Sequence, residues 1–167
     1  MLLMEDISLQ SCKPVIEWII EANLVEERPQ ALNLMICSPG GDLAAAFAVI
    51  DVIRGSTIPV QTIGLGEIAS AGLLIFLAGE KGKRVLTPNT SILSHQYAWG
   101  AVGKHHELVA AAKEYTNIDS RLINHYKKTT NLDEKRIREI LLPPQDIWLT
   151  AKEAKEYGVC DIIKDLK

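Results

Sequence analysis

The sequence has few cysteines and no excess of charge of one sign. Three cysteines occur among its 167 residues, and no two of them form a C-x-x-C pair, so we expect neither a disulfide framework nor a zinc site. This cysteine usage favours a reducing, cytoplasmic setting. The formal net charge of −3 gives no electrostatic reason to expect a nucleic-acid partner.

Long apolar runs, targeting signals and repeats are also missing from the sequence. No apolar stretch reaches the roughly 18 residues of a membrane span. The N-terminal MLLMEDIS turns acidic instead of carrying a basic region followed by an apolar one, which argues against a targeting signal. There is no low-complexity tract and no repeat of about 20 to 50 residues. We therefore expect one domain over residues 1–167, without a membrane partner.

The sequence instead alternates apolar runs with helical patterns. An apolar run at residues 32–37 is followed by SPGG and then by apolar residues at helical spacing. The same unit recurs at residues 59–79, where Gly64 and Gly66 predict a turn and a helix opens near Ser70. Strands and helices in this order predict an α/β fold of repeated βαβ units around a parallel sheet.

Further strands and helices surround these two units. The pattern predicts short strands at residues 1–9, 84–86, 91–95 and 159–163, a helix with Pro14 in its first turn, and a helix capped by Asn131. A helical pattern at residues 104–129 would be about 37 Å long, which is longer than a domain of this size needs internally. We therefore expect this helix to reach a neighbouring subunit.

Three residues have the side-chain types of a nucleophile, a base and an orienting acid. Ser70 stands at a helix start, His95 at a strand end and Asp146 just beyond a helix break. The N–H groups and the positive end of the helix dipole beside Ser70 favour loss of its proton. Any chain of this length offers serines, histidines and aspartates, so a helix-cap serine and a core histidine remain the alternative.

Two turns offer backbone N–H groups that no bulky side chain shields. Gly41 lies in the SPGG turn, and Ala71 follows Ser70 directly. Two such donors could hold the negative oxygen of a tetrahedral intermediate, as an oxyanion hole does. The alternative for SPGG is a tight turn followed by a helix cap.

A nucleotide site is a competing interpretation of the second unit. Residues 64–69 fit the dinucleotide-binding pattern G-x-G-x-x-A. About 20 residues further on, where this interpretation needs an acidic residue for the ribose, stand Lys83 and Arg84. We therefore expect no nucleotide cofactor.

The histidines of the long helix are the remaining candidates for metal ligands. His105, His106 and His125 have no carboxylate or cysteine at ligand spacing, so we expect them to lie on the surface. The sequence thus predicts no metal site and no cofactor.

Three stretches of the sequence together resemble one family. They read LMICSPGGDLAAAFAVID, GLGEIASAGLLIFLAGEKGKRVLTPNTSILSHQ and DIWLTAKEAKEYGVCDII. They resemble the proteolytic subunit of the Clp protease, a self-compartmentalising serine peptidase, over about residues 7–163. The resemblance implies a crotonase-like α/β fold, a handle at about residues 97–130, and heptameric rings of identical subunits stacked in pairs.

The resemblance also implies roles for the site residues. Ser70 is similar to the family's nucleophile, His95 to its general base and Asp146 to its orienting acid, while Gly41 and Ala71 match the oxyanion-hole positions. An extended peptide would then lie as an added strand between residues 41–43 and 97–100. The substrate-binding residues expected on this basis are Gly40, Leu43, Tyr97, Trp99 and Gly100. Before Asp146, Pro143-Pro144-Gln145 replaces the charged residues usual in the family.

The leading hypothesis is an ATP-independent serine endopeptidase that cleaves short or unfolded peptides inside a homo-oligomeric chamber. An AAA+ unfoldase would be a separate partner, and the family's N-terminal axial segment, which helps to dock it, is not part of this sequence. One alternative is a weakly active or inactive ring subunit that assembles with or modulates a catalytic homologue. A crotonase-type acyl-CoA enzyme is the third interpretation, because that fold shares an oxyanion hole of two N–H groups.

Overall fold

The fold is an α/β arrangement around one mixed sheet, which confirms the predicted fold class. It is described by a computed structural model over residues 1–166. Five strands pair in parallel in the order β1 (Leu2–Leu3), β2 (Leu32–Ser38), β3 (Val60–Ala69), β4 (Val85–Leu86) and β7 (Ile162–Ile163). β5 (Ser91–Ser94) pairs in parallel with β3, whereas β6 (Ile147–Thr150) pairs with β5 in the antiparallel sense.

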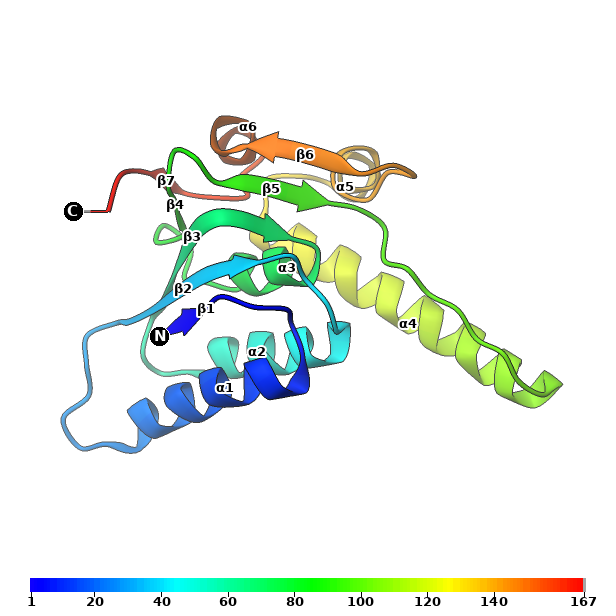
Figure 1. The fold of residues 1–167 in the computed structure, drawn as a ribbon, viewed down its shortest axis with the longest axis horizontal. Helices are drawn as coiled ribbons and strands as arrows, with labels where there is room; N and C mark the ends of the chain where they lie inside the picture. The colour runs from blue at the N-terminus through cyan, green and yellow to red at the C-terminus, as the bar shows by residue number, and fades with distance from the viewer. Residues whose placement is uncertain (167) are drawn as a thin grey trace.

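The helices connect these strands and cover the sheet. They are α1 (Leu9–Leu24), α2 (Leu43–Gly55), α3 (Ala71–Leu77), α4 (His105–Thr129), α5 (Glu134–Ile140) and α6 (Ala151–Glu156). In Figure 1, α1 and α2 lie side by side on one face of the sheet, and α4 projects away from the body of the molecule.

The core centres on α3, the helix that follows Ser70. All seven residues of α3 are buried, and Phe76 is among the largest fully buried side chains. Each buried Leu, Ile or Phe contributes about 1.5–3 kcal/mol to folding. A helix that is apolar on every side needs neighbours all round it, so this helix is held firmly at the centre of the fold.

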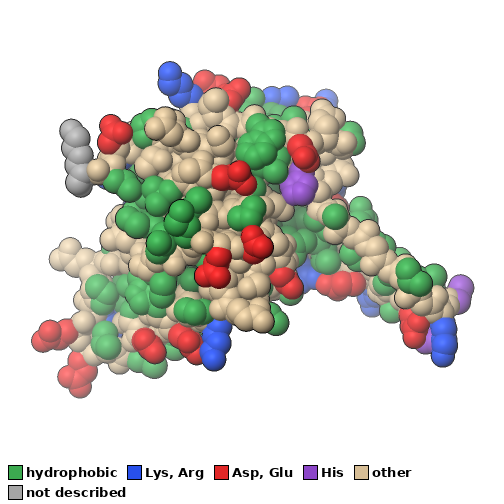
Figure 2. All heavy atoms as spheres, in the orientation of Figure 1, with side chains coloured by type: hydrophobic (Ala, Val, Ile, Leu, Met, Phe, Trp, Pro, Cys, Tyr) green, Lys and Arg blue, Asp and Glu red, His purple; other side chains and the backbone are tan. Residues whose placement is uncertain are grey.

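The long helix α4 is buried over only part of its length. Its buried residues lie near its C-terminal end, at Leu122, Ile123, His125 and Tyr126. Toward the other end, Leu108 is 42 % exposed and Val109 is 57 % exposed. Figure 2 shows this part as an arm with apolar side chains among its charged ones. The fold therefore includes the protruding helix that the sequence predicts.

β3 differs from the predicted strand and turn. Gly64 and Gly66 lie inside the strand, not in a turn before the helix. The pairing with β2 shifts between Ile36–Gly64 and Ser38–Ile68, and Gly66 has φ 58° at this irregularity. Glycine supplies the left-handed conformation that such a bulge needs. The G-x-G-x-x-A pattern therefore forms strand backbone and does not cradle a phosphate at a helix start.

Two predicted helix starts were wrong. α1 begins five residues before Pro14, because the Ser8 and Ser11 side chains reciprocally bond the N–H groups at its start. α5 is capped by Asp133, which accepts from the Arg136 N–H at 2.8 Å, and not by Asn131. Strand β6 was not predicted at all. Among residues 1–166, no helix combines the length and the apolar character needed to cross a membrane.

Candidate active site

Ser70 occupies a sharp turn between β3 and α3. Its φ of 52° and ψ of −121° make it the one non-glycine residue with positive φ among residues 1–166. This backbone conformation costs on the order of 1–3 kcal/mol and persists only where neighbouring structure enforces it. Here the Ser70 N–H donates to the Leu93 carbonyl at 3.0 Å, and the Ser70 carbonyl accepts from the Leu73 N–H at 3.0 Å. The turn is therefore fixed by β5 on one side and by α3 on the other.

The SPGG turn lies directly against Ser70. A Cβ added to Gly40 would come within 2.6 Å of the Ser70 Cβ and 3.1 Å of the Ala71 nitrogen. Gly40 also has φ 101°, so this position requires glycine both for backbone conformation and for space. Two chain segments that are far apart in the sequence thus meet at the proposed nucleophile.

The two N–H groups predicted to form an oxyanion hole come from these two segments. The Ile7 N–H donates to the Gly40 carbonyl at 2.7 Å, and the Asp42 N–H donates to the Ile7 carbonyl at 2.8 Å. These bonds fix the backbone on either side of the Gly41 N–H and do not use it. The Ala71 N–H lies at the start of α3, where the first N–H groups of a helix have no intrahelical partner. Both donors are thus held by rigid backbone near Ser70.

His95 and Asp146 meet because of the register between β5 and β6. Ser94 pairs with Ile147, so the next residues outward along this antiparallel pair are His95 and Asp146. The His95 Nδ1 lies 3.7 Å from the Asp146 Oδ1. The register therefore brings the predicted base and acid together from segments about 50 residues apart.

His95 and Asp146 lie close together, but no hydrogen bond joins them. The separation of 3.7 Å between His95 and Asp146 exceeds hydrogen-bonding distance. Among residues 1–166, no hydrogen bond joins the Ser70 hydroxyl to His95. The Asp146 side chain is 66 % exposed. Such contacts often shorten only when substrate binds, so a separation of 3.7 Å is compatible with a catalytic pair of base and acid.

The segment after His95 packs along α4. The rings of Tyr97 and Trp99 each lie with their centroids 5.4 Å from that of Tyr115. The Tyr97 hydroxyl donates to the Tyr115 carbonyl at 3.0 Å. Burial raises the pKa of Tyr97 to about 12, so this hydroxyl keeps its proton. The Tyr97 side chain is therefore engaged with α4, whereas Trp99 is 45 % exposed and Gly100 is exposed.

The prediction for His125 was wrong. Its side chain is only 2 % exposed, whereas His105 and His106 lie on the surface as expected. Nδ1 of His125 lies 2.7 Å from Arg54 Nη2, and Nε2 lies 2.8 Å from the Leu74 carbonyl. Within residues 1–166, no group of three or more His, Cys, Asp or Glu side chains is arranged to hold a metal ion.

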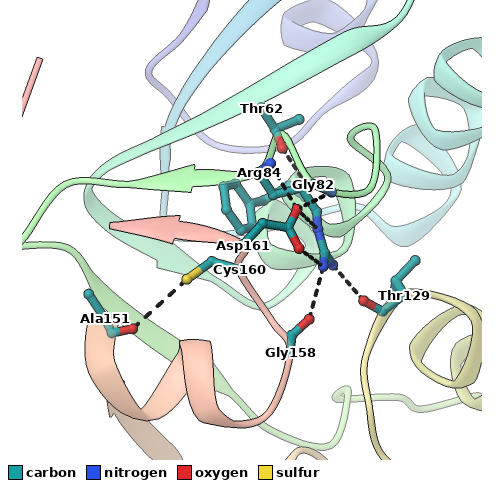
Figure 3. A network of polar contacts seen from close by, with 9 residues as sticks. Thr62, Gly82, Arg84, Thr129, Ala151, Gly158, Cys160 and Asp161 are labelled. Atoms are coloured by element: carbon teal, nitrogen blue, oxygen red, sulfur yellow. Dashed lines mark hydrogen bonds and ion pairs between the residues drawn. The ribbon is translucent and has the colours of Figure 1, made fainter. Parts of the chain in front are cut away.

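A second polar cluster joins Arg84, the residue before β4, to the segment before β7. Arg84 donates to both carboxylate oxygens of Asp161, at 2.9 and 2.6 Å, and to the Gly158 carbonyl at 3.1 Å. Figure 3 shows the Arg84 guanidinium between Asp161, Gly158 and Thr129. Every side of this guanidinium has an acceptor, which is the pattern of a structural ion pair and not of a ligand site.

Comparisons with known proteins agree with the fold and the sequence pattern. The family model described as Clp protease matches residues 1–167. The chain is 37 % identical over 150 residues to the ATP-dependent Clp protease proteolytic subunit 2 of Treponema denticola, covering 88 % of this chain and 74 % of that protein. It is 35 % identical over 137 residues to the ATP-dependent Clp protease proteolytic subunit of Deinococcus radiodurans, covering 81 % of this chain and 66 % of that protein.

A solved structure is also similar over nearly the whole chain. A ClpP1 mutant from Listeria monocytogenes has a TM-score of 0.86 and 27 % identity, and the match covers 99 % of this chain and 91 % of that one. The match supports the arrangement of sheet and helices described above.

Proposed function

The chain belongs to the Clp protease family, and on that premise we propose that it is a serine endopeptidase whose catalytic residues are Ser70, His95 and Asp146. The observation that carries this proposal is the strained backbone of Ser70, which the SPGG turn and β5 hold in place. Strain of this kind is kept where a side chain must be presented in one orientation, as a nucleophile must.

Each residue has a defined role in the proposed reaction. His95 takes the proton of the Ser70 hydroxyl as the serine oxygen attacks the carbonyl carbon of the peptide bond. The Gly41 and Ala71 N–H groups stabilise the negative oxygen of the tetrahedral intermediate. His95 then gives its proton to the leaving amine, and water hydrolyses the acyl-enzyme. Asp146 orients the imidazole and stabilises its charged form.

The substrate is proposed to be an extended peptide. Residues 41–43 and 97–100 flank the site and could pair with such a chain through backbone hydrogen bonds, as an added strand does. Unfolded or short peptides fit this mode of binding because their backbone groups are available. Hydrolysis itself needs no ATP, and an unfoldase would be a separate partner.

The proposed assembly is a cytoplasmic homo-oligomer of stacked rings. The exposed apolar residues on the outer half of α4 support it, because Leu108, Val109 and Tyr115 are 42 %, 57 % and 45 % exposed in the single chain. A second ring would bury them.

The test is a fluorophosphonate probe and a short fluorogenic peptide, applied to one sample whose native mass is also measured. We expect labelling at Ser70, hydrolysis of the peptide and loss of both in Ser70→Ala. Ser120→Ala is the control, since Ser120 is exposed on α4 and bonds only the Thr116 carbonyl. An assembled wild-type sample without labelling at Ser70 would refute the catalytic role.

A weakly active or inactive ring subunit is the second candidate. It is favoured by one observation, the exposed Asp146 side chain at 3.7 Å from His95 without a hydrogen bond. On this interpretation, the chain assembles with a catalytic homologue into mixed rings. Ser70→Ala would then leave the peptidase activity of the mixed rings unchanged, whereas the first proposal requires that it falls.

A further inference from the structure

The residues on both sides of His95 contact the segment that leads to Asp146. The Ser94 hydroxyl donates to the Leu141 carbonyl, and the Gln96 Nε2 donates to the Leu142 carbonyl at 3.0 Å. The two donors flank the proposed base, and the two acceptors are consecutive. The side chains around His95 therefore hold the beginning of the segment that ends at Asp146.

These two carbonyls need partners from outside their own helix. Leu141 is the C-cap of α5, and the N–H groups of Leu141 and Leu142 both donate to the Ile137 carbonyl. The last carbonyls of a helix have no intrahelical donor. Pro143 and Pro144 follow at once and bring no N–H groups. Leu141 is 0 % exposed and Leu142 is 6 % exposed, so water is not a ready substitute.

The direction of the bonds around Ser94 is fixed by the groups involved. A carbonyl only accepts, so the single Ser94 proton is used on Leu141. The Tyr126 hydroxyl, 3.3 Å away, must then donate to the Ser94 oxygen. Burial raises the pKa of Tyr126 to about 12, so its proton is present throughout the physiological range. Ser94 is 0 % exposed, so the chain from Tyr126 through Ser94 to Leu141 is enclosed in the core.

The other end of the segment is also fixed to β5. Ile147 pairs with Ser94 in the antiparallel ladder, so residues 141–147 are attached to β5 at both ends. Asp146 lies between these attachments, with a largely exposed side chain. Its position relative to His95 thus depends on the contacts of its neighbours more than on contacts of its own.

We propose that Ser94 and Gln96 are positioning residues that hold the Asp146 segment against the His95 strand, with Tyr126 supporting Ser94. This inference rests on the proposed function, because it concerns how the proposed acid is aligned with the proposed base. The side-chain hydrogen bonds of these two residues go to Tyr126, Leu141 and Leu142 and not to Ser70, His95 or Asp146, so we expect their effect to pass through the position of Asp146.

A double-mutant cycle tests whether the effect does pass through Asp146. Ser94→Ala and Gln96→Ala are each expected to lower kcat for peptide hydrolysis roughly ten- to hundredfold with little change in KM, because misplacement of a catalytic group slows the chemical step. In an Asp146→Asn background the same substitutions should cause no further loss. Ser94→Thr, which keeps the hydroxyl, should recover much of the rate. If the fold-loss in kcat of the double variant instead equals the product of the two single losses, the proposal is overturned.

Thr62→Val is the matched control for a general loss of stability. Thr62 is 0 % exposed, and its hydroxyl donates to the Phe76 carbonyl at 2.8 Å, away from both β5 and residues 141–147. Thr62→Val also removes a buried hydrogen bond from a hydroxyl to a carbonyl. We expect any effect of Thr62→Val on kcat to be the same in the wild-type and the Asp146→Asn backgrounds. If Thr62→Val reproduces the kinetic pattern of Ser94→Ala, the proposal fails.

Hydrogen exchange gives a readout that does not require peptidase activity. The N–H groups of residues 145–147 should exchange several-fold faster in Ser94→Ala and Gln96→Ala than in the wild type, because the segment opens more often, and not in Thr62→Val. Gln96 is exposed, so its alanine variant should fold even if Ser94→Ala does not. Unchanged exchange in Gln96→Ala would refute the attachment, whereas an inactive wild type would count only against the proposed function.

Discussion

Arg54 on α2 donates a hydrogen bond across 2.7 Å to Nδ1 of His125 on α4. A guanidinium only donates and a carbonyl only accepts, so the contact of Nε2 with the Leu74 carbonyl requires a proton on Nε2 and none on Nδ1. His125 is therefore neutral in the folded protein. Through this one ring, the buried end of α4 is joined both to α2 and to α3, the helix that follows Ser70.

Acid should weaken the fold through His125. Burial lowers its pKa from 6.5 to about 4, and the nearby charges of Arg54, Lys128 and Arg84 add to the effect, although the bond to Leu74 opposes it. Between these pH values the unfolded chain binds the proton more readily than the folded one. The stability that depends on a neutral His125 is therefore fully present above pH 6.5 and is lost as the pH falls toward 4. The free energy of unfolding should fall by roughly 3 kcal/mol over this range.

Urea unfolding at several pH values between 7 and about 4 measures this loss. His125→Leu should flatten the pH dependence over this range relative to the wild type, while His105→Gln, an exposed histidine of the same helix, should leave it unchanged. If the free energy of unfolding changes equally with pH in wild type and His125→Leu, other groups cause the loss of stability in acid.

The contact between Gly40 and Ser70 predicts the effect of a single added methyl group. Gly40→Ala should displace the Ser70 turn, because its Cβ would come within 2.6 Å of the Ser70 Cβ and φ 101° disfavours any side chain. We expect the rate of fluorophosphonate labelling at Ser70 to fall at least tenfold, in line with a displacement of about 1 Å. Gly55→Ala is the control, because no atom lies within 4 Å of its added Cβ. Equal labelling of both variants would contradict the close packing.

The Arg84–Asp161 pair should be costly to break. Burial disfavours the charge of Asp161, but the hydrogen bonds from Arg84 and Gly82 outweigh it and lower the pKa of this carboxyl. Asp161→Asn leaves the buried Arg84 charge without its partner and should destabilise the fold by about 3–5 kcal/mol. Glu17→Gln, which breaks an exposed pair with Lys13, should cost less than about 1 kcal/mol. Similar losses in the two variants, measured by urea unfolding, would refute this assignment.

The exposed part of α4 predicts how assembly can be disrupted. If stacked rings bury Leu108, a charge placed there should separate them, because a buried carboxylate without a partner is strongly unfavourable. Leu108→Glu is therefore expected to lower the native mass without lowering the melting temperature of the subunit. Lys113→Glu, an exposed charge change on the same helix, serves as the comparison. An unchanged mass in Leu108→Glu would place the contact between rings elsewhere.

The sequence predicted those parts of the fold that depend on local pattern. The helix after SPGG begins where Asp42 caps it, and the helix after Thr150 begins with a capping box between Thr150 and Glu153. These signals lie within four residues of each other along the chain. The family resemblance added the crotonase-like fold, which local pattern alone does not give.

The parts that were missed depend on partners far away in the sequence. Strand β6 has strand-favouring residues, but no pattern near it in the sequence indicates that it pairs with β5. Its last residue, Thr150, is also the N-cap of α6. His125 was expected on the surface because no carboxylate or cysteine stands at ligand spacing from it, and its actual partner, Arg54, is 71 residues away in the sequence. Ser94 likewise lies 47 residues from the carbonyl that it bonds. Local periodicity carries no information about such pairs.

The distance along the chain between β5 and β6 also sets the order in which the site can form during synthesis. A ribosome completes β3, α3 and β5 well before it adds β6, so the nascent chain carries Ser70 and His95 while Asp146 does not yet exist. The strand pairing that brings the acid to the base is then among the last to form. If the proposed triad is correct, the enzyme stays inactive during the period when its own unfolded chain would be the nearest substrate.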